Sequence, residues 1–344
     1  MVERPLATGE QINGEKVVIN PARIEAVILR SVEAYQSGKD IFSQEVIPPE
    51  RAFIQAAKKY EQEESSEDFA LNSLFFLMMN LFADNSTAQL RRVSRPSFFQ
   101  RYAWLFKPEE VIKRPKEEIL TAASEYLAPG LNKTALDGWQ HNAQVLVERY
   151  QGSIRSFFAE HNGDAPTILE ALMGPKRKNN YPGLRRFGQK LGSLFLIWVH
   201  EYKLAELKKI SDLGIPVDFQ VVRIMVQTGG VDLPEGVVHK HHVVNKLVPA
   251  LTSVCRKIEQ ERGISPAIVS KSLWFIGHLC CNNYEHQACP INQMCSRLIS
   301  RGPLDEKGLV DPSDVGRFKT RRAVLAEKRR RRQIVAGQKE LSLF

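Results

Sequence analysis

The sequence has no apolar leader at its N-terminus and no apolar run long enough to cross a bilayer. The opening stretch "MVERPLATGEQING" holds no signal-like region, so we expect a cytoplasmic protein that is not exported. The most apolar stretch, residues 70–83, is interrupted by Asn72, Ser73 and Asn80. A span needs about 20 apolar residues, so this stretch predicts a buried helix, and we expect no membrane partner.

Strand patterns, sequence repeats and phosphate-binding loops are also missing. No convincing alternation of apolar and polar residues predicts a strand, and no Gly-rich loop of the nucleotide-binding type occurs. Apolar residues instead recur with helical spacing. Pro21, Pro96, Pro108 and Pro266 stand where helices are expected to begin, and Gly38 stands where one ends. We therefore predict an all-α fold.

The composition leaves little room for wholesale disorder, since 43% of the residues are hydrophobic and Pro and Gly are modest. The net charge of +9 is uneven. Residues 317–332 hold nine Lys or Arg and one Glu, a net +8, which leaves about +1 for the remainder. Such a basic tail suits an anionic partner, most often nucleic acid, although a solvated helix end or a free arm would have the same composition.

Cysteine is almost confined to one short segment. Cys255 stands apart and is expected in the core, whereas four cysteines lie within the sixteen residues 280–295. In a chain that is not exported, such crowding favours metal or cluster ligation over disulfides.

One acidic residue stands out in "LGIPVDFQVVRIM". Pro216 keeps the preceding backbone extended, so Asp218 falls where a helix N-cap belongs. The position permits two interpretations: the carboxylate only caps the helix, or it is also directed at a substrate.

Three segments resemble the helix-hairpin-helix DNA glycosylase superfamily, and in particular its iron–sulfur, endonuclease III-like branch. "IPVDFQVVRI" resembles the family's Val-Asp-x-x-Val-x-Arg segment, "FGQKLGS" its Gly-x-Lys stretch, and "CPINQMC" its last two cluster cysteines. The resemblance covers roughly residues 130–300. It divides the chain into an N-terminal helical region of unknown role (1–115), a glycosylase core (116–278), a cysteine-rich loop (279–300) and a basic tail (301–344).

The resemblance implies roles for particular residues. Asp218 corresponds to the catalytic aspartate, and Lys190 to the nucleophile of the members that also cleave the strand. Burial of Lys190 in the apolar helix that follows would favour its neutral, nucleophilic amine; the alternatives are pairing with Asp218 or exposure to solvent. The hairpin implies DNA contacts from Gly183, Arg185, Arg186, Gly188 and Gln189, although "LRRF" lengthens it between the glycines. Trp139, Tyr181, Phe187 and Phe219 are candidates for stacking on a flipped base or for the core.

The family's four cluster cysteines are matched only in part. Cys289 and Cys295 have the family spacing, the second position is occupied by His286, and Cys281 is a better first ligand than Cys280. These residues imply a 4Fe-4S cluster; zinc on three cysteines and a histidine, or no metal at all, are the alternatives.

The resemblance therefore implies a monomeric enzyme acting on double-stranded DNA that contains a damaged or modified base. It would flip the base out of the stack and hydrolyse the N-glycosyl bond, with Lys190 adding AP-lyase activity. The base itself is open, and a bulky modified base of foreign or phage DNA fits the unmatched N-terminal region. The alternatives are a non-catalytic DNA-binding module on the same scaffold and an N-glycosidase acting on nucleosides or RNA.

Overall fold

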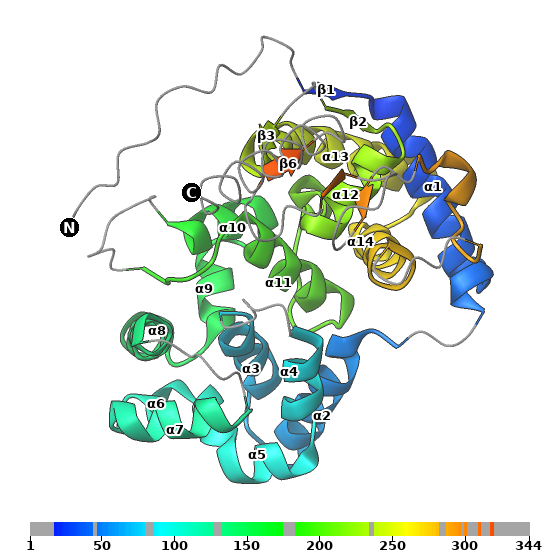
Figure 1. Ribbon diagram of the computed structural model, residues 1–344. Coiled ribbons are helices and arrows are strands. Elements are labelled where there is room, and N and C mark those ends of the chain that lie inside the picture. Colours follow the sequence, from blue (N-terminus) through cyan, green and yellow to red (C-terminus); the bar gives the residue numbers. More distant parts are fainter. Residues whose placement is uncertain are drawn as a thin grey trace, which may run out of the picture. The chain divides into compact units, whose positions relative to one another are not determined.

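A computed structural model gives the fold of the chain (Figure 1). The residues that it describes are 17–43, 47–79, 86–126, 133–174, 183–233, 237–281, 287–296, 299–300, 309–310 and 317–319. The described chain is mostly helical, which confirms the prediction of an all-α fold at the level of fold class.

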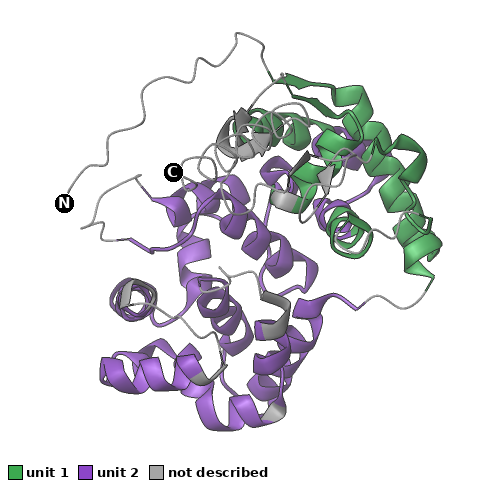
Figure 2. Ribbon diagram, viewed as in Figure 1, with its two compact units in different colours: residues 1–44, 217–254, 272–344 green, residues 45–216, 255–271 purple. Residues whose placement is uncertain are grey.

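The chain forms two compact units, each assembled from separate stretches of sequence (Figure 2). Unit 1 comprises residues 1–44, 217–254 and 272–344, and unit 2 comprises residues 45–216 and 255–271. This division differs from the predicted boundaries at residues 115, 278 and 300. One reason is that a single hydrophobic core runs through unit 2 from Phe53 to Leu213, on both sides of residue 115.

Unit 2 is a bundle of helices, three of which begin at a proline: Pro49, Pro96 and Pro108. Pro96 and Pro108 each open a helix, as the sequence predicts, and Lys116, the first residue of a further helix, follows Pro115. Its elements are α2 (Pro49–Glu63), α3 (Phe69–Met78), α4 (Ser86–Val93), α5 (Pro96–Tyr102), η2 (Ala103–Phe106), α6 (Pro108–Val111), α7 (Lys116–Tyr126), α8 (Lys133–Tyr150), α9 (Ile154–Glu160), α10 (Ala165–Met173), α11 (Gln189–Glu201) and η3 (Ile210–Leu213).

Helix α3 is the central helix of unit 2, and all ten of its residues are buried. This confirms the prediction of a buried helix in residues 70–83 for the part that is described. Its one amide, Asn72, is satisfied: Nδ2 donates to the carbonyl oxygen of Gly152 at 2.9 Å, and Oδ1 accepts from the backbone N–H of Ile154 at 3.0 Å. A buried polar group with both partners present costs little, so α3 is fixed against the α8–α9 turn.

Unit 1 combines the first long helix of the chain with segments that follow residue 216. Helix α1 runs from Pro21 to Ser37 and ends at Gly38 in the left-handed region, as predicted. The other elements are η1 (Asp40–Phe42), α12 (Phe219–Gln227), the π-helical turn η4 (Ile276–Cys281) and η5 (Asn292–Met294). Helices α13 (Lys240–Arg262) and α14 (Pro266–Phe275) contribute residues to both units.

Unit 1 also contains short strands that the sequence did not predict. The strands are β1 (Val18–Ile19), β2 (Val231–Asp232), β3 (Val237–His239), β4 (Ile299–Ser300), β5 (Leu309–Val310) and β6 (Arg317–Lys319). β1 pairs with β2 in antiparallel fashion, and the other four form one sheet in the order β3-β6-β5-β4. Strands of two or three residues are too short to leave an alternating pattern.

Among the described helices, no single one is long and apolar enough to cross a membrane. One strongly bent pair, Val243–Arg262 with Pro266–Cys281, meets the length and composition requirement only when its two helices are taken together.

Candidate functional site

Asp218 caps α12, as the first of its two interpretations predicted. Its backbone is extended, and its Oδ1 accepts a hydrogen bond from the N–H of Val221 at 3.0 Å. The preceding residues Ile215, Pro216 and Val217 are buried, so the chain enters the helix along a fixed path. The capping bond satisfies one of the N–H groups that a helix start leaves without an intrahelical partner.

The cap uses only one oxygen of the Asp218 carboxylate. Oδ2 forms neither a hydrogen bond nor an ion pair with any residue in the described part of the chain. The side chain is half-buried rather than enclosed. The positive end of the α12 dipole lies next to this carboxylate. Asp218 is therefore a rigidly held carboxylate with one oxygen left for another partner.

Helix α12 connects Asp218 to the cysteine-rich segment. The helix is buried along most of its length, and it includes an arginine, Arg223, that is only 1% exposed. Arg223 donates to the carbonyl oxygen of Cys281 at 3.0 Å and to Oε1 of Gln220 at 2.6 Å. Burying a guanidinium is costly unless it is hydrogen-bonded, and the bond to Cys281 holds α12 against η4.

The other end of α12 is fixed to the same segment. The backbone carbonyl of Gln227 accepts bonds from the N–H of Ser296 at 2.7 Å and from its hydroxyl at 2.8 Å. Arg23 of α1 donates to the carbonyl oxygens of Thr228 and Met294, at 2.6 and 3.3 Å. The residues after Ile276 thus contact α12 at both of its ends.

Four cysteines line one small cavity beside α12. The cavity has a volume of about 10 Å³ and is bounded by Cys280, Cys281, Cys289 and Cys295, together with Ile224, Gln227, Thr228, Ile291 and Asn292. Cys295 also lies 3.1 Å, sulfur to oxygen, from Oε1 of Gln227. The predicted ligands Cys281, Cys289 and Cys295 are therefore brought together, whereas His286 lies outside the described residues.

The thiols are mutually close enough to interact electrostatically. Burial raises the pKa of the Cys281 thiol to about 12, the Arg223 guanidinium opposes this rise, and Cys289 and Cys295 add to it. Three converging thiols are the donor chemistry of thiophilic metals and iron–sulfur clusters. Among the described side chains, no group of three or more His, Cys, Asp or Glu is placed to hold a metal ion. The three thiols fit such a metal in kind, and the predicted fourth ligand is not among the residues described.

The isolated Cys255 belongs to the core, as predicted. Its side chain is 1% exposed, and burial raises the pKa of its thiol to about 12. Trp139 and Phe187 are also buried in the core. Of their two alternatives, core packing and stacking on a flipped base, the structure favours core packing.

The predicted hairpin segment lies in unit 2, in the connection that enters α11. Asn142 of α8 is fully buried and holds this connection from both sides: its Oδ1 accepts from the N–H of Arg185 at 2.8 Å, and its Nδ2 donates to the carbonyl oxygen of Arg185 at 3.0 Å. Nε2 of His141 lies 2.9 Å from the carbonyl oxygen of Gly183. Burial is the main cause that lowers the pKa of this imidazole.

Arg186 is the most constrained residue of this connection. Its φ of 77° is in the left-handed region, which is uncommon for residues other than glycine. Its side chain lies against Gly138 of α8, where a Cβ would come within 2.3 Å of Cδ, and Nε donates to the carbonyl oxygen of Met79 at 3.3 Å. Burial lowers the pKa of the guanidinium. Arg186 is therefore partly used in packing the connection against α8.

Gly188, Gln189 and Lys190 are exposed at the N-terminus of α11. Gly188 is the N-cap, no side chain caps this helix, and no atom would lie within 4 Å of a Cβ built on Gly188. Of the alternatives for Lys190, the structure shows exposure to solvent and not burial in the apolar helix. The reason is positional: Lys190 is in the first turn, and burial begins only at Gly192. Lys190 belongs to unit 2 and Asp218 to unit 1.

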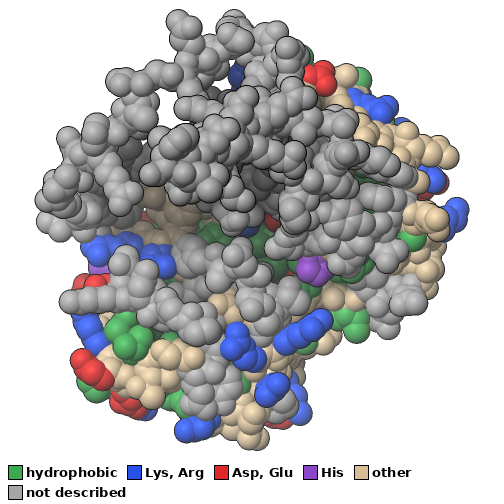
Figure 3. Space-filling model, in the orientation of Figure 1, with side chains coloured by type: hydrophobic (Ala, Val, Ile, Leu, Met, Phe, Trp, Pro, Cys, Tyr) green, Lys and Arg blue, Asp and Glu red, His purple; other side chains and the backbone are tan. Residues whose placement is uncertain are grey.

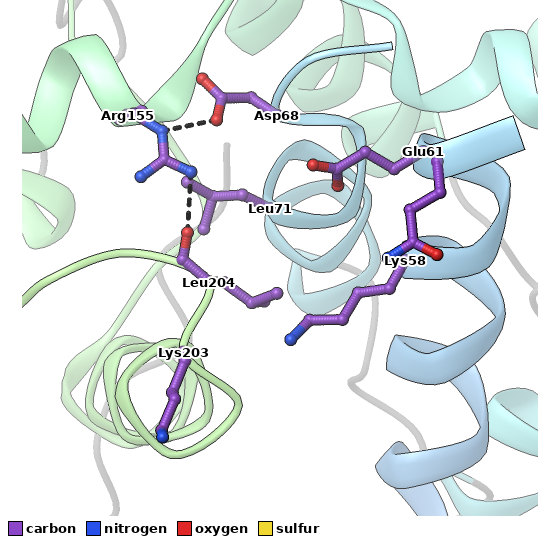
Figure 4. A pocket seen from close by; sticks show the side chains of 8 residues that line it. Lys58, Glu61, Asp68, Leu71, Arg155, Lys203 and Leu204 are labelled. Carbon is purple, nitrogen blue, oxygen red and sulfur yellow. Dashed lines mark hydrogen bonds and ion pairs between the residues drawn. The ribbon is translucent and has the colours of Figure 1, made fainter. Parts of the chain in front are cut away.

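Unit 2 also contains a polar pocket whose lining cations bind backbone carbonyl groups of the protein itself (Figure 4). It has a volume of about 230 Å³, and Lys58, Lys203, Arg155 and Asp68 are among its lining residues. Lys58 donates to the carbonyl oxygen of Tyr202 at 2.6 Å, and Arg155 donates to that of Leu204 at 2.8 Å and to Asp68 at 2.5 Å. These cations satisfy carbonyls at and just beyond the C-terminal end of α11, where positive charge is favourable.

Sequence reasoning missed the residues that hold the candidate site in place. Asn142 and His141 occur in an ordinary amphipathic stretch, "DGWQHNAQ", and nothing in its spacing points to a loop more than 40 residues away. Arg223 stood in the quoted segment "IPVDFQVVRI" and was not assigned a contact. Comparison with protein-family models and with curated proteins finds no match to this chain.

Proposed function

We propose that the protein is a DNA N-glycosylase that removes a damaged or modified base, with Asp218 as its catalytic carboxylate. The observation that carries this proposal is the state of Asp218: one oxygen fixes the side chain to the start of α12, and the other has no partner among the described residues. The capping bond already fixes the orientation of this carboxylate, so substrate binding does not have to restrict its side-chain rotation.

The chemistry requires a negative charge at this kind of position. As the N-glycosyl bond breaks, its electron pair leaves with the base and positive charge builds on the sugar around C1′. The free oxygen of Asp218 would stabilise that charge and accept a proton from the attacking water, whose oxygen forms the new bond to C1′. The departing base is released after it gains a proton.

Duplex binding in this proposal uses the start of α11 and the basic tail. The uncapped N-terminus at Gly188, with Gln189 and Lys190 exposed beside it, offers backbone N–H groups of the kind that hold phosphates. Gly183 and the half-buried Arg185 and Arg186 flank it. Residues 317–332 would add attraction that does not depend on sequence and weakens with salt.

AP-lyase activity is a separate part of the proposal and depends on Lys190. After the base has left, attack of its amine on C1′ of the ring-opened sugar, with loss of one water, would give a Schiff base that borohydride reduces to a stable protein–DNA adduct. We expect such an adduct with the wild-type chain and none with Lys190→Ala. Because Lys190 is exposed at a helix start, this substitution should leave folding intact. An adduct of undiminished yield in the variant would exclude Lys190 as the nucleophile.

The cysteine-rich segment is proposed to hold a 4Fe-4S cluster through Cys281, His286, Cys289 and Cys295. When bound, the cluster would cross-link the segment that contacts α12 at both ends, and so support the helix that positions Asp218. Purified protein should then be brown and contain iron, with loss of both in a Cys289→Ser/Cys295→Ser variant. A colourless, iron-free protein that contains zinc would replace the cluster with zinc, and a metal-free protein would remove both.

A second candidate function is a non-catalytic DNA-binding module. It is favoured by the same capping bond, because a carboxylate that stabilises α12 already has a sufficient structural role. A screen of duplexes with oxidised, alkylated, mismatched and bulky modified bases, including modified viral DNA, decides between the two. The glycosylase releases at least one base and loses this activity in Asp218→Asn. The binding module releases none, and its affinity is the same in both proteins.

A further inference from the structure

One surface of unit 2 carries a concentration of arginine that the proposed function does not use. Residues 85–108 contain five Lys or Arg and neither Asp nor Glu: Arg91, Arg92, Arg95, Arg101 and Lys107. They lie on α4, on α5 and at the residues that follow these helices. Figure 3 shows Lys and Arg side chains gathered over the part of this unit that holds α2, α4 and α5.

Packing turns two of these arginines outward. Gln89, Leu90 and Val93 form the buried face of α4, and Phe98 and Phe99 form that of α5. Arg91 is on the outer side of α4, and Arg95 is the N-cap residue of α5; both are exposed. Three residues separate them in the sequence, and both carry a positive charge.

No described residue compensates these two charges. Neither Arg91 nor Arg95 forms an ion pair or a side-chain hydrogen bond within the part of the chain that the structure describes. Glu118 of α7 is already paired with Arg114. Two exposed guanidinium groups with no partner among the described residues are available to an external anion.

We propose that Arg91 and Arg95, together with Arg92 and Arg101 of the same segment, form a contact surface for the phosphate backbone of duplex DNA. Guanidinium groups match phosphate oxygens in geometry as well as in charge. A row of cations without acids is the arrangement that binds a polyanion irrespective of its sequence.

The described part of this surface differs from the usual membrane or protein interface. Stable membrane association adds a second, apolar anchor to a basic patch, and the core of a protein interface is enriched in aromatic residues. In the described chain the exposed large hydrophobic residues are Val18 and Ile47, and neither belongs to this segment. The aromatic rings nearby are covered by cations: Arg101 lies 4.9 Å from the ring centre of the buried Tyr102, and Arg114 lies 4.2 Å from that of Trp104.

This inference rests on the DNA-binding part of the proposed function and not on base removal. It is tested by titrating the full chain with an unmodified fluorescent duplex at several NaCl concentrations. For the variant Arg91→Gln/Arg95→Gln we expect the slope of log K against log salt to become shallower by about 2, and affinity at 0.1 M salt to fall about tenfold. Thermal unfolding checks that both substitutions leave the fold intact.

Two further variants distinguish the effect of charge at this surface from the effect of the protein's net charge. Lys113 and Lys116 are exposed, lie in the same unit and are paired with Glu110 and Asp137. Lys113→Gln/Lys116→Gln changes the net charge equally and should leave the slope unchanged, and Arg91→Lys/Arg95→Lys should retain most of it. Equal slopes for wild type and Arg91→Gln/Arg95→Gln, or no DNA binding by wild type, overturn the inference. A shallower slope without base release overturns only the glycosylase.

Discussion

Two aspartates of this chain cap helices in the same way. They differ in how many of their carboxylate oxygens have a partner among the described residues. Asp164 caps α10 in unit 2, and Asp218 caps α12 in unit 1. Asp164 uses both oxygens: Oδ1 accepts from the N–H and hydroxyl of Thr167, at 3.2 and 2.9 Å, and Oδ2 pairs with Lys209 at 2.5 Å. Asp218 accepts one bond, from Val221, and has no cation paired with it among the described residues.

The difference distinguishes a carboxylate that only stabilises its helix from one that can also bind a substrate. The hydrogen bond from Lys209 is the largest cause that lowers the pKa of Asp164 to about 2, followed by the bonds from Thr167. Such a carboxylate has its preferred partners inside the protein and is poorly suited to receive a substrate. A cap that satisfies the helix with one oxygen and keeps the other free can serve both purposes, so the two aspartates form a natural pair of test and control.

The largest expected effect is on base release. Asp218→Asn keeps an oxygen that can cap α12 but removes the negative charge, so we expect single-turnover base release to fall at least about a hundredfold. Asp164→Asn makes the same chemical change at the other cap and should leave release within about twofold of wild type.

Release is measured on whichever duplex the wild-type chain cleaves, with circular dichroism and unfolding curves for all three proteins. Equal losses in the two variants would mean that the rate reports stability rather than chemistry. Full activity in Asp218→Asn would remove Asp218 from the mechanism and end the contrast between the caps.

A smaller effect is expected on stability at Asp218 itself. Asp218→Ala removes the acceptor for the N–H of Val221 and should lower the free energy of unfolding by about 1 kcal/mol, whereas Asp218→Asn should stay within a few tenths. Urea unfolding near neutral pH measures both. If alanine and asparagine destabilise equally, the capping bond contributes little, and the rigidity invoked for the free oxygen has another source.

The two caps also show which structural features local sequence signals can predict. Signals that act over a few residues were sufficient for the helix starts at Pro21, Pro96 and Pro266, and for Asp218 as a cap after Pro216. They depend on backbone geometry that each residue carries with it wherever it is placed. The mostly helical fold followed from apolar spacing for the same reason.

Features that depend on contacts between segments far apart in the sequence were not predicted. Lys190 precedes an apolar stretch, which suggested burial, but the buried stripe of α11 starts two residues later. The division into two interleaved units depends on which helices share a core, and no local pattern encodes that. The anchoring of Arg185 by Asn142 requires two segments to meet, as does the bond from Arg223 to Cys281. Cys255 was the easier case, because one isolated cysteine in an apolar stretch is most often core.

The smallest expected effect is the pH dependence that Lys209 and Thr167 confer on Asp164. Its pKa in the folded protein, about 2, lies below the ordinary 3.8, so the folded state binds fewer protons between these values. The stabilisation is therefore complete above about pH 4 and is lost as the pH falls through 2. Asp164→Asn should be less stable than wild type at pH 5, with the gap narrowing towards pH 2 in urea unfolding. Lys209→Met should show a similar narrowing, since it removes the largest cause of the shift. A gap that stays constant from pH 5 to pH 2 would show that the carboxylate of Asp164 is not held by these partners, and that its difference from Asp218 does not lie in charge.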